Sequence, residues 1–206
     1  MTIPESKNAE IKNSNFTIEF WAKIDKQLVP KLYHSSGITV HNNIISKTNT
    51  TTGWNEHVYT KTSYKNQCYL RFKINSYNVA ANQFMIGLNY DPTTDTSYSS
   101  IDFCWYCDNG VGYIFQSNNH IFGEQTATWL NGTTVTNAII PGTIKAGDIF
   151  EIIYDISHIS YYYNGKRYGY QHGTSVENKT FYLDSSFNNS FNNIVEIQEF
   201  SDIIPN

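Results

Sequence analysis

Paired carboxylates are the first residues here that could do chemistry, because glycoside hydrolysis uses two of them on either side of one bond. Two pairs are candidates, Glu151 with Asp155 in FEIIYD and Glu196 with Glu199 in VEIQEF. In a strand, Glu151 and Asp155 share a face but lie about 13 Å apart, too far for a pair that forms a covalent intermediate. Glu196 and Glu199 are expected on opposite faces. The spacing therefore predicts a protein that is not an enzyme.

Thiols and imidazoles add no stronger candidate. Cys104 and Cys107 form a C-x-x-C in CWYC, but this segment reads as a strand, where residues three apart point to opposite faces. A zinc site would need a second ligand pair, and the sequence has no other C-x-x-C. We therefore expect free, buried thiols in a protein made in a reducing cytoplasm. No nucleophile motif Gly-x-Ser-x-Gly accompanies the six histidines, which are His34, His41, His57, His120, His158 and His172.

Tryptophan and asparagine beside turns are the candidate ligand-binding residues. Trp54-Asn55 follows NTTTG, and Trp129 precedes LNGTT, which contains Asn131. Sugar sites pair an aromatic platform with amide and carboxylate groups that bind hydroxyls. The alternative, which we favour for each tryptophan, is that it folds back to close an open end of the protein.

A loop rich in oxygen ligands is the candidate metal site. The segment LNYDPTTDTSYSSID contains Asn89, Asp91, Asp95 and Asp102, and hard cations such as calcium take six to eight oxygen ligands. Asn89 and Asp91 are also candidate ligand-binding residues, and Asp91 with Asp95 would hold the calcium. The favoured alternative is a plain Asx turn without any cofactor, since Asp91 precedes a proline.

Alternation of apolar and polar residues predicts the elements that position these groups. In NFTIEFWAKI (residues 15–24) every second residue is apolar, which is typical of a half-buried strand. Turn clusters separate the other short runs, and no window has a helical pattern with a cap, apart from one short turn within SYNVAANQF. The sequence predicts an all-β antiparallel β-sandwich with little or no helix. The other predicted strands are NNIISKT, HVYTKT, CYLRFKI, QFMIGLNY, SIDFCWY, GYIFQ, DIFEIIYD, ISYYYN, KTFYLD and NIVEIQEF.

Five tyrosines surround the dipeptide Asn164-Gly165 in SYYYNGKRYGY. Asn-Gly is the strongest two-residue hairpin signal, because a type I′ turn needs positive φ at both positions. Tyr161 and Tyr163 would face one way and Tyr162 the other. We expect the tyrosines to be mostly part of the scaffold.

Composition excludes several functions. The net charge is −4 with scattered Lys and Arg, so we expect no nucleic-acid partner. No apolar run approaches 18 residues, so we expect no membrane insertion, and the first sixteen residues lack the features of a secretory signal. The length suits one domain over residues 1–206, with a core from about residue 15 to 201.

The alternating segments NFTIEFWAKI and GDIFEIIYDISHISYYYNGKRY resemble motifs of laminin-G-like and concanavalin-A-like jelly rolls, including SPRY-type modules. The stretch FMIGLNYDPTTDTSYSSIDFCWYCDNGVGYIF is similar to modules of phage and large-virus fibre or surface proteins. The resemblance implies a jelly-roll fold, in which calcium often lies on such a loop. It implies a non-catalytic, glycan-binding module that attaches a virion to a host-surface receptor. The alternatives are a structural virion-surface, capsid-decorating or fibre subunit that contacts copies of itself or other virion proteins, and, less favoured, a polysaccharide-acting enzyme.

Overall fold

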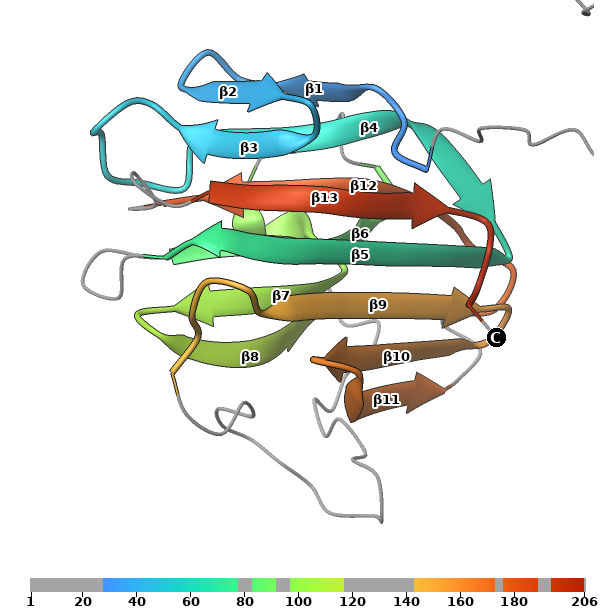
Figure 1. Ribbon diagram of the computed structural model, residues 1–206. Helices are drawn as coiled ribbons and strands as arrows, with labels where there is room; N and C mark the ends of the chain where they lie inside the picture. Colours follow the sequence, from blue (N-terminus) through green and yellow to red (C-terminus); the bar gives the residue numbers. More distant parts are fainter. Residues whose placement is uncertain are drawn as a thin grey trace, which may run out of the picture.

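Two antiparallel sheets lie face to face in the computed structural model, which describes residues 28–77, 83–91, 97–116, 143–172, 176–188 and 194–205 (Figure 1). The six-stranded sheet comprises, in order, β1 (Leu32–His34), β4 (Glu56–Lys65), β12 (Thr180–Phe187), β6 (Gln83–Asn89), β7 (Phe103–Asp108) and β8 (Val111–Gln116). The seven-stranded sheet comprises β11 (Lys166–His172), β10 (His158–Tyr163), β9 (Ile149–Asp155), β5 (Gln67–Ser76), β13 (Ile194–Ser201), β3 (Ile44–Lys47) and β2 (Ile38–His41). The predicted all-β antiparallel sandwich is confirmed.

The predicted strands from β3 onward are present, and the structure adds β1 and β2. β1 has only three residues, too few for alternation to be recognised, whereas β2, with four, is as long as the predicted β3. The helical structure of the described residues is one 3-10 turn, η1 (Tyr98–Ser100). The predicted helical turn in SYNVAANQF and the predicted strand at residues 15–24 fall wholly or mainly outside the described residues. The single domain over residues 1–206 therefore stays a prediction.

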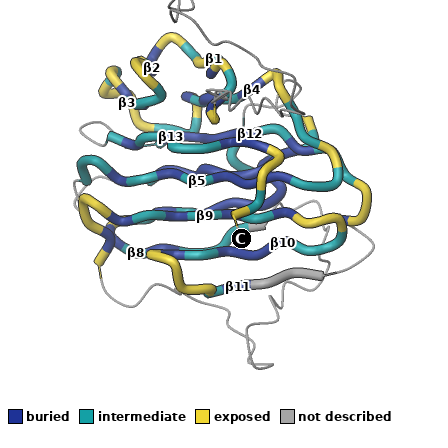
Figure 2. The backbone as a smooth tube through the Cα atoms, turned by 45° about the vertical axis from the view of Figure 1, so that its right-hand side comes forward, coloured by how far each residue is buried: buried dark blue, intermediate teal, exposed yellow. Residues whose placement is uncertain are grey.

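A large aromatic and aliphatic core fills the space between the sheets, and buried positions run along the strands of both sheets in Figure 2. Phe72 of β5 and Phe150 of β9 stack at 5.0 Å between ring centroids, and Trp105 of β7 meets Phe150 edge-on at 5.3 Å. The Trp105 indole donates a hydrogen bond of 3.1 Å to the backbone carbonyl of Glu151 in β9. This bond crosses from one sheet to the other, so it fixes β9 relative to the six-stranded sheet.

The cysteines confirm the alternation in β7. Cys104 and Cys107 are both fully buried and free, yet Cys107 belongs to the main core while Cys104 packs with Met85 and Ile101 on the outer face of the six-stranded sheet. The third cysteine, Cys68, lies in the main core. The C-x-x-C motif is therefore divided between two faces of one strand, as the sequence predicts.

The tyrosine hairpin is also confirmed. Asn164 and Gly165 have φ of 48° and 76°, the left-handed values that a type I′ turn requires. Tyr161 and Tyr163 point into the main core, whereas Tyr162 is on the outer face.

Within the described ranges, no helix is long and apolar enough to cross a membrane.

Candidate functional site

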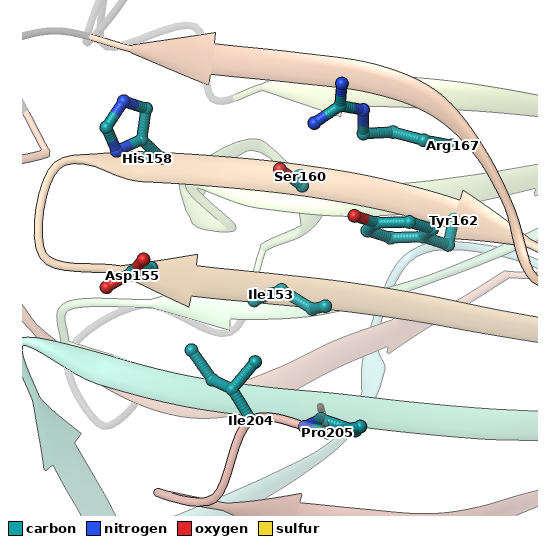
Figure 3. A pocket seen from close by; sticks show the side chains of 8 residues that line it. All are labelled: Ile153, Asp155, His158, Ser160, Tyr162, Arg167, Ile204 and Pro205. Atoms are coloured by element: carbon teal, nitrogen blue, oxygen red, sulfur yellow. The ribbon is translucent and has the colours of Figure 1, made fainter.

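A pocket of about 360 Å³ lies on the outer face of the seven-stranded sheet, over β9, β10 and β11 (Figure 3). Its size is at the small end of the range for ligand pockets. Polar, aromatic and aliphatic side chains line it together. The residues are Ile153, Asp155, His158, Ser160, Tyr162, Arg167, Ile204 and Pro205.

Strand alternation brings the polar groups together. In β10, His158, Ser160 and Tyr162 are every second residue and therefore project from one face. Antiparallel pairing sets His158 opposite Asp155 and Ser160 opposite Ile153, so the side chains of Asp155 and Ile153 on β9 project from the same face. The Ser157 hydroxyl lies 3.0 Å from the His158 Nδ1 atom and orients the imidazole. The floor of the pocket is thus built from two paired strands and not from loops.

The two-residue turn at Asn164-Gly165 places Arg167 in the pocket, because it sets Lys166 opposite Tyr163 and Arg167 opposite Tyr162. Tyr162 pairs with Arg167 but Tyr161 pairs with Gly169, so Tyr168 is the additional residue on β11. Tyr168 packs edge-on against Tyr163 at 6.0 Å, on the core side. The bulge lies beyond Arg167 and shifts the pairing from Gly169 onward, whereas Arg167 shares the outer face with Tyr162 through their direct pairing.

Buried Asp148 holds the tip of this hairpin. Its carboxylate accepts hydrogen bonds from the Tyr163 hydroxyl at 2.7 Å, the Asn164 amide at 3.1 Å and the Lys145 backbone N–H at 2.8 Å. The Asn164 side-chain oxygen in turn accepts from the Ile149 N–H at 2.9 Å. These bonds tie the start of β9 to the turn that precedes Arg167.

The turn at the other end of the pocket has a strained residue. Ile156 has φ of 48°, which is a genuine outlier for a β-branched residue. Its carbonyl accepts from the Tyr154 hydroxyl at 3.0 Å and from the Asn178 N–H at 3.2 Å, and its N–H donates to Asn66. Fully paired backbone groups maintain this conformation, and strain of this kind clusters at functional sites. The turn fixes the separation of Asp155 and His158.

The C-terminal segment forms the apolar wall. After β13 the chain turns back over the outer face of the sheet and ends near β9 and β10 (Figures 1 and 2). The Gln67 amide donates to the Asp202 carbonyl at 2.8 Å, which anchors this return. Tyr69 pairs with Ile153 and therefore faces outward, yet only 1% of it is exposed. Ile204 and Pro205 complete the pocket above this covered region (Figure 3).

An ionic network borders the pocket on β5. Glu151, opposite Tyr162, accepts hydrogen bonds from the Tyr69 hydroxyl and from Arg71 Nη1, the latter at 3.2 Å. Arg71 Nε also donates to the Gln198 side chain at 2.9 Å. Burial, followed by the neighbouring carboxylate, raises the pKa of Tyr69 to about 12, so its hydroxyl remains a donor at neutral pH. The network stiffens the sheet beside the pocket.

The predicted side-chain directions are right for one carboxylate pair and wrong for the other. Glu151 and Asp155 share the outer face, as predicted. Glu196 and Glu199 also share it, because a bulge at Gln198 restores the outward direction at Glu199, and the prediction of opposite faces was wrong. Glu196 accepts from Asn75 and Glu199 from Ser201, so both carboxylates are engaged in the sheet.

Trp54 lies on the other side of the sandwich from the pocket. It is half-buried and contacts Tyr98 at 4.8 Å and Tyr106 at 5.8 Å between ring centroids, over the small cluster that contains Met85. Trp54 therefore covers the outer face of the six-stranded sheet and does not close an open end of the sandwich. Asn55 is exposed next to it. Trp129 and Asn131 lie outside the described residues, so their role as ligand contacts stays a prediction.

Asn89 and Asp91 form an Asx turn. The Asn89 side-chain oxygen accepts from the Asp91 N–H at 3.2 Å, and its amide donates to buried Asp184 at 2.8 Å. Asp91 is exposed, and Asp95 lies outside the described residues. Among the residues described, no group of three or more His, Cys, Asp or Glu side chains could hold a metal. The calcium site at Asp91 and Asp95 therefore stays a prediction.

Comparison with solved structures assigns the fold. No protein-family model matches the sequence, and no curated protein matches it in sequence. The SPRY domain of human HERC1 is 17% identical with a TM-score of 0.53, and the match covers 79% of this chain and 92% of that one. The carbohydrate recognition domain of Emp47p is 10% identical, with a TM-score of 0.54 and coverage of 86% and 90%. The exoplasmic/lumenal domain of VIP36, bound to Ca²⁺ and Man3GlcNAc, is 7% identical, with a TM-score of 0.56 and coverage of 85% and 84%.

The chain has the concanavalin-A-like jelly-roll fold. Both the SPRY and the lectin-like relationships expected from the motifs are confirmed at the level of fold. Similar structures also include one described as a glycosyl hydrolase, so the fold occurs in binding domains and in enzymes. The resemblance to phage and large-virus modules stays a prediction.

Sequence reasoning missed the pocket although part of the signal was present. Asp155, His158, Ser160 and Tyr162 all lie in the quoted hairpin motif, and the two-residue turn at Ile156 sets them on one face. The candidate Trp54 lies instead over the opposite sheet. Ile204 and Pro205 could not be found from sequence, because their position depends on how the C-terminal segment turns back.

Proposed function

We propose that the protein is a non-catalytic carbohydrate-binding module and that the pocket over β9, β10 and β11 is its sugar site. The observation that carries this proposal is the row of polar side chains on two paired strands, facing an aliphatic wall. Sugar rings present hydroxyls on their edges and apolar C–H groups on their faces. A pocket with both kinds of lining meets both needs.

The charged residues and the flat residues of the pocket have roles that their chemistry supports. The Asp155 carboxylate accepts hydrogen bonds from sugar hydroxyls, and Arg167 donates from its rigid guanidinium group. The Tyr162 ring and Pro205 offer flat apolar surface to the ring face. Because these groups are placed by strands, they need little reordering on binding, which reduces the entropic cost of association.

The absence of catalysis is part of the proposal. Hydrolysis needs a second carboxyl group across the bond from the first. Among the residues described around the pocket, Asp155 supplies the carboxylate, while neighbouring Glu151 is held by Tyr69 and Arg71. We therefore expect bound oligosaccharides to remain intact on prolonged incubation, and release of reducing ends would contradict this.

A glycan array followed by calorimetric titration tests the site. Mannose-containing glycans are the first probes, since VIP36 was solved with Man3GlcNAc. Asp155→Ala and Arg167→Ala should each weaken binding roughly tenfold or more, because each removes a charged hydrogen-bonding partner. Lys145→Ala, an exposed residue away from the pocket, is the matched control. Saturable binding that is unchanged in both pocket variants would remove the site from this pocket, and its loss in Trp54→Ala would move the site to the other sheet.

The setting that we propose is the surface of a phage or large virus, where the module binds a host-surface glycan. This rests on the motif resemblance alone. The alternative in that setting is a structural subunit that works through contacts with its own copies. Sedimentation of the purified chain separates the two, because a monomer at high concentration with a functional sugar site supports attachment, and a stable assembly without one supports the structural role.

A further inference from the structure

A second surface, on the outer face of the six-stranded sheet, combines aromatic rings with positive charge. It consists of Lys31, Tyr33, His57, Tyr59 and Lys61, at the edge formed by β1 and β4, and we call it the basic aromatic patch. The two lysines are exposed and the three rings are half-buried. The patch belongs to the sheet opposite the one that carries the pocket.

The three rings form a continuous stack. Tyr33 of β1 pairs with Tyr59 of β4, and their rings stack at 5.6 Å with an interplanar angle of 24°. His57 stacks on the same Tyr59 ring at 5.5 Å and 26°. Since residues 57, 59 and 61 alternate along β4, they project from one face together.

Both ammonium groups converge on one ring. The Lys61 Nζ atom lies 4.5 Å and the Lys31 Nζ atom 5.0 Å from the centroid of Tyr33. The register, in which Leu32 pairs with Thr60, sets Lys31 across from Lys61. Like charges directly opposite each other destabilise a sheet. The attraction of each ammonium to the tyrosine ring offsets part of that cost.

The carboxylates of the described residues leave this charge uncompensated. Neither lysine forms an ion pair with a carboxylate of the described residues. Glu56, next to His57, is buried and accepts hydrogen bonds from Ser35, Gly37 and Asn49. Asp184, beside Tyr59 on β12, is buried as well and accepts from Asn89. An external anion could therefore lower the energy of the patch by entering between the two lysines.

We propose that the basic aromatic patch binds an acidic glycan, with a sulfate or carboxylate group between Lys31 and Lys61 and a sugar ring against the exposed part of the Tyr33 and Tyr59 side chains. Aromatic rings bind the apolar faces of sugars, and paired ammonium groups bind an anionic substituent. Single-stranded nucleic acid also stacks on aromatic rings, but it requires a groove whose positive charge follows the backbone. Two lysines on a chain of net charge −4 do not form such a groove.

Calorimetry at low ionic strength tests the proposal with three probes of equal length. These are a sulfated oligosaccharide, the same oligosaccharide after removal of its sulfates, and an oligomer of uronic acid. We expect at least one acidic probe to bind and the desulfated one not to bind, and the comparison of the two acidic probes identifies the preferred anion. The proposal is overturned if neither acidic probe binds, or if the desulfated probe binds as well as its parent.

Matched variants locate the site. Lys31→Gln/Lys61→Gln should lower the affinity for the acidic probe roughly tenfold or more. The control Lys73→Gln/Lys145→Gln removes the same charge from elsewhere and should leave the affinity nearly unchanged. Tyr33→Leu should weaken binding while Tyr33→Phe, which keeps the ring, should not. Equal losses in the two lysine pairs would mean a nonspecific charge effect and would overturn the assignment. An oligonucleotide that binds more tightly through the same lysines would overturn it in favour of nucleic acid.

The patch can be tested independently of the sugar pocket. Binding of the acidic probe should persist in Asp155→Ala, because that residue lies on the other sheet. If Asp155→Ala abolishes acidic binding, the pocket is the acidic site and the present proposal fails while the proposed function survives.

Discussion

Asp148→Ala should be among the most destabilising single substitutions in the seven-stranded sheet. Asp148 is 2% exposed, and its carboxylate accepts three hydrogen bonds, from Tyr163, Asn164 and the backbone of Lys145. Hydrogen bonds to charged groups contribute roughly 1.5–3 kcal/mol each, but removal of the buried carboxylate also removes its desolvation cost. The Tyr163 hydroxyl, in a residue only 9% exposed, would lose this acceptor. We expect a net loss of about 3 kcal/mol in the free energy of unfolding.

Urea denaturation followed by circular dichroism measures this loss directly. For a domain of this size, about 3 kcal/mol corresponds to a fall of roughly 6–12 °C in the melting temperature. Asp148→Asn keeps one acceptor oxygen and should lose less. Asp155→Ala, which removes an exposed carboxylate of the pocket, is the control and should change stability by under about 0.5 kcal/mol.

A double-mutant cycle with Tyr163→Phe tests whether the Tyr163 hydroxyl and Asp148 stabilise the fold together. If the hydrogen bond from the Tyr163 hydroxyl to Asp148 stabilises the fold, the effects of the two substitutions on the free energy of unfolding should be coupled by about 1–2 kcal/mol. Additive losses would refute the proposed clamp, and so would a loss below about 0.5 kcal/mol for Asp148→Ala. If the losses are additive, the hairpin tip is held by its type I′ turn and by the packing of the tyrosines in the core.

Further predictions concern burial and close packing elsewhere in the fold. Burial raises the pKa of Asp102 to about 7, so its contribution to stability is greatest below its unfolded pKa of about 4 and falls as the pH rises to 7. Asp102→Asn, which keeps an acceptor for the Tyr90 N–H, should therefore stabilise the protein by roughly 2–4 kcal/mol at pH 8 and have little effect at pH 4, as measured by urea denaturation. Gly87→Ala should lower stability by about 3 kcal/mol or prevent folding, since the added Cβ would lie 2.0 Å from the Phe103 carbonyl oxygen, and soluble yield and melting temperature would show this. The three buried thiols, whose pKa values burial raises, should react with a thiol reagent only on unfolding, and fast labelling of the native protein would contradict their placement.

Most strands could be predicted because their alternation is regular and each is bounded by turn residues. The separation of Cys104 from Cys107 and the direction of the hairpin tyrosines followed from the period of two. The same period failed at Glu199, where the bulge at Gln198 shifts every later residue by one position. A bulge depends on pairing with the neighbouring strand, and a single strand's sequence does not contain that information.

The site depends on tertiary structure to a greater degree than the strands do. Arg167 faces outward with Tyr162 because the two-residue turn pairs them, but the apolar wall requires the return of the C-terminal segment to Ile204. Trp54 beside a turn was compatible with a sugar platform and with packing at an open end of the sandwich, of which packing was favoured. Its contacts with Tyr98 and Tyr106 show that much of the ring covers the sheet. Local sequence could therefore propose polar residues on one face of a strand, but not which face forms a pocket.

The placement of the two proposed sites on different sheets leads to a last prediction. The hydrophobic core lies between the pocket and the basic aromatic patch, and packed sheets are about 10 Å apart. Effects at sites this far apart, without shared partners, usually add. Asp155→Ala should therefore be combined with Lys31→Gln/Lys61→Gln in one protein. Its affinity for a neutral glycan should fall only as far as in Asp155→Ala alone, and its affinity for an acidic glycan only as far as in Lys31→Gln/Lys61→Gln alone. One glycan carrying both features, long enough to reach around the edge of the sandwich, should bind the wild type more tightly than either part, since the second contact becomes intramolecular. If the Asp155 substitution changes the effect of the lysine substitutions on the binding of either short probe, then one site binds both ligands.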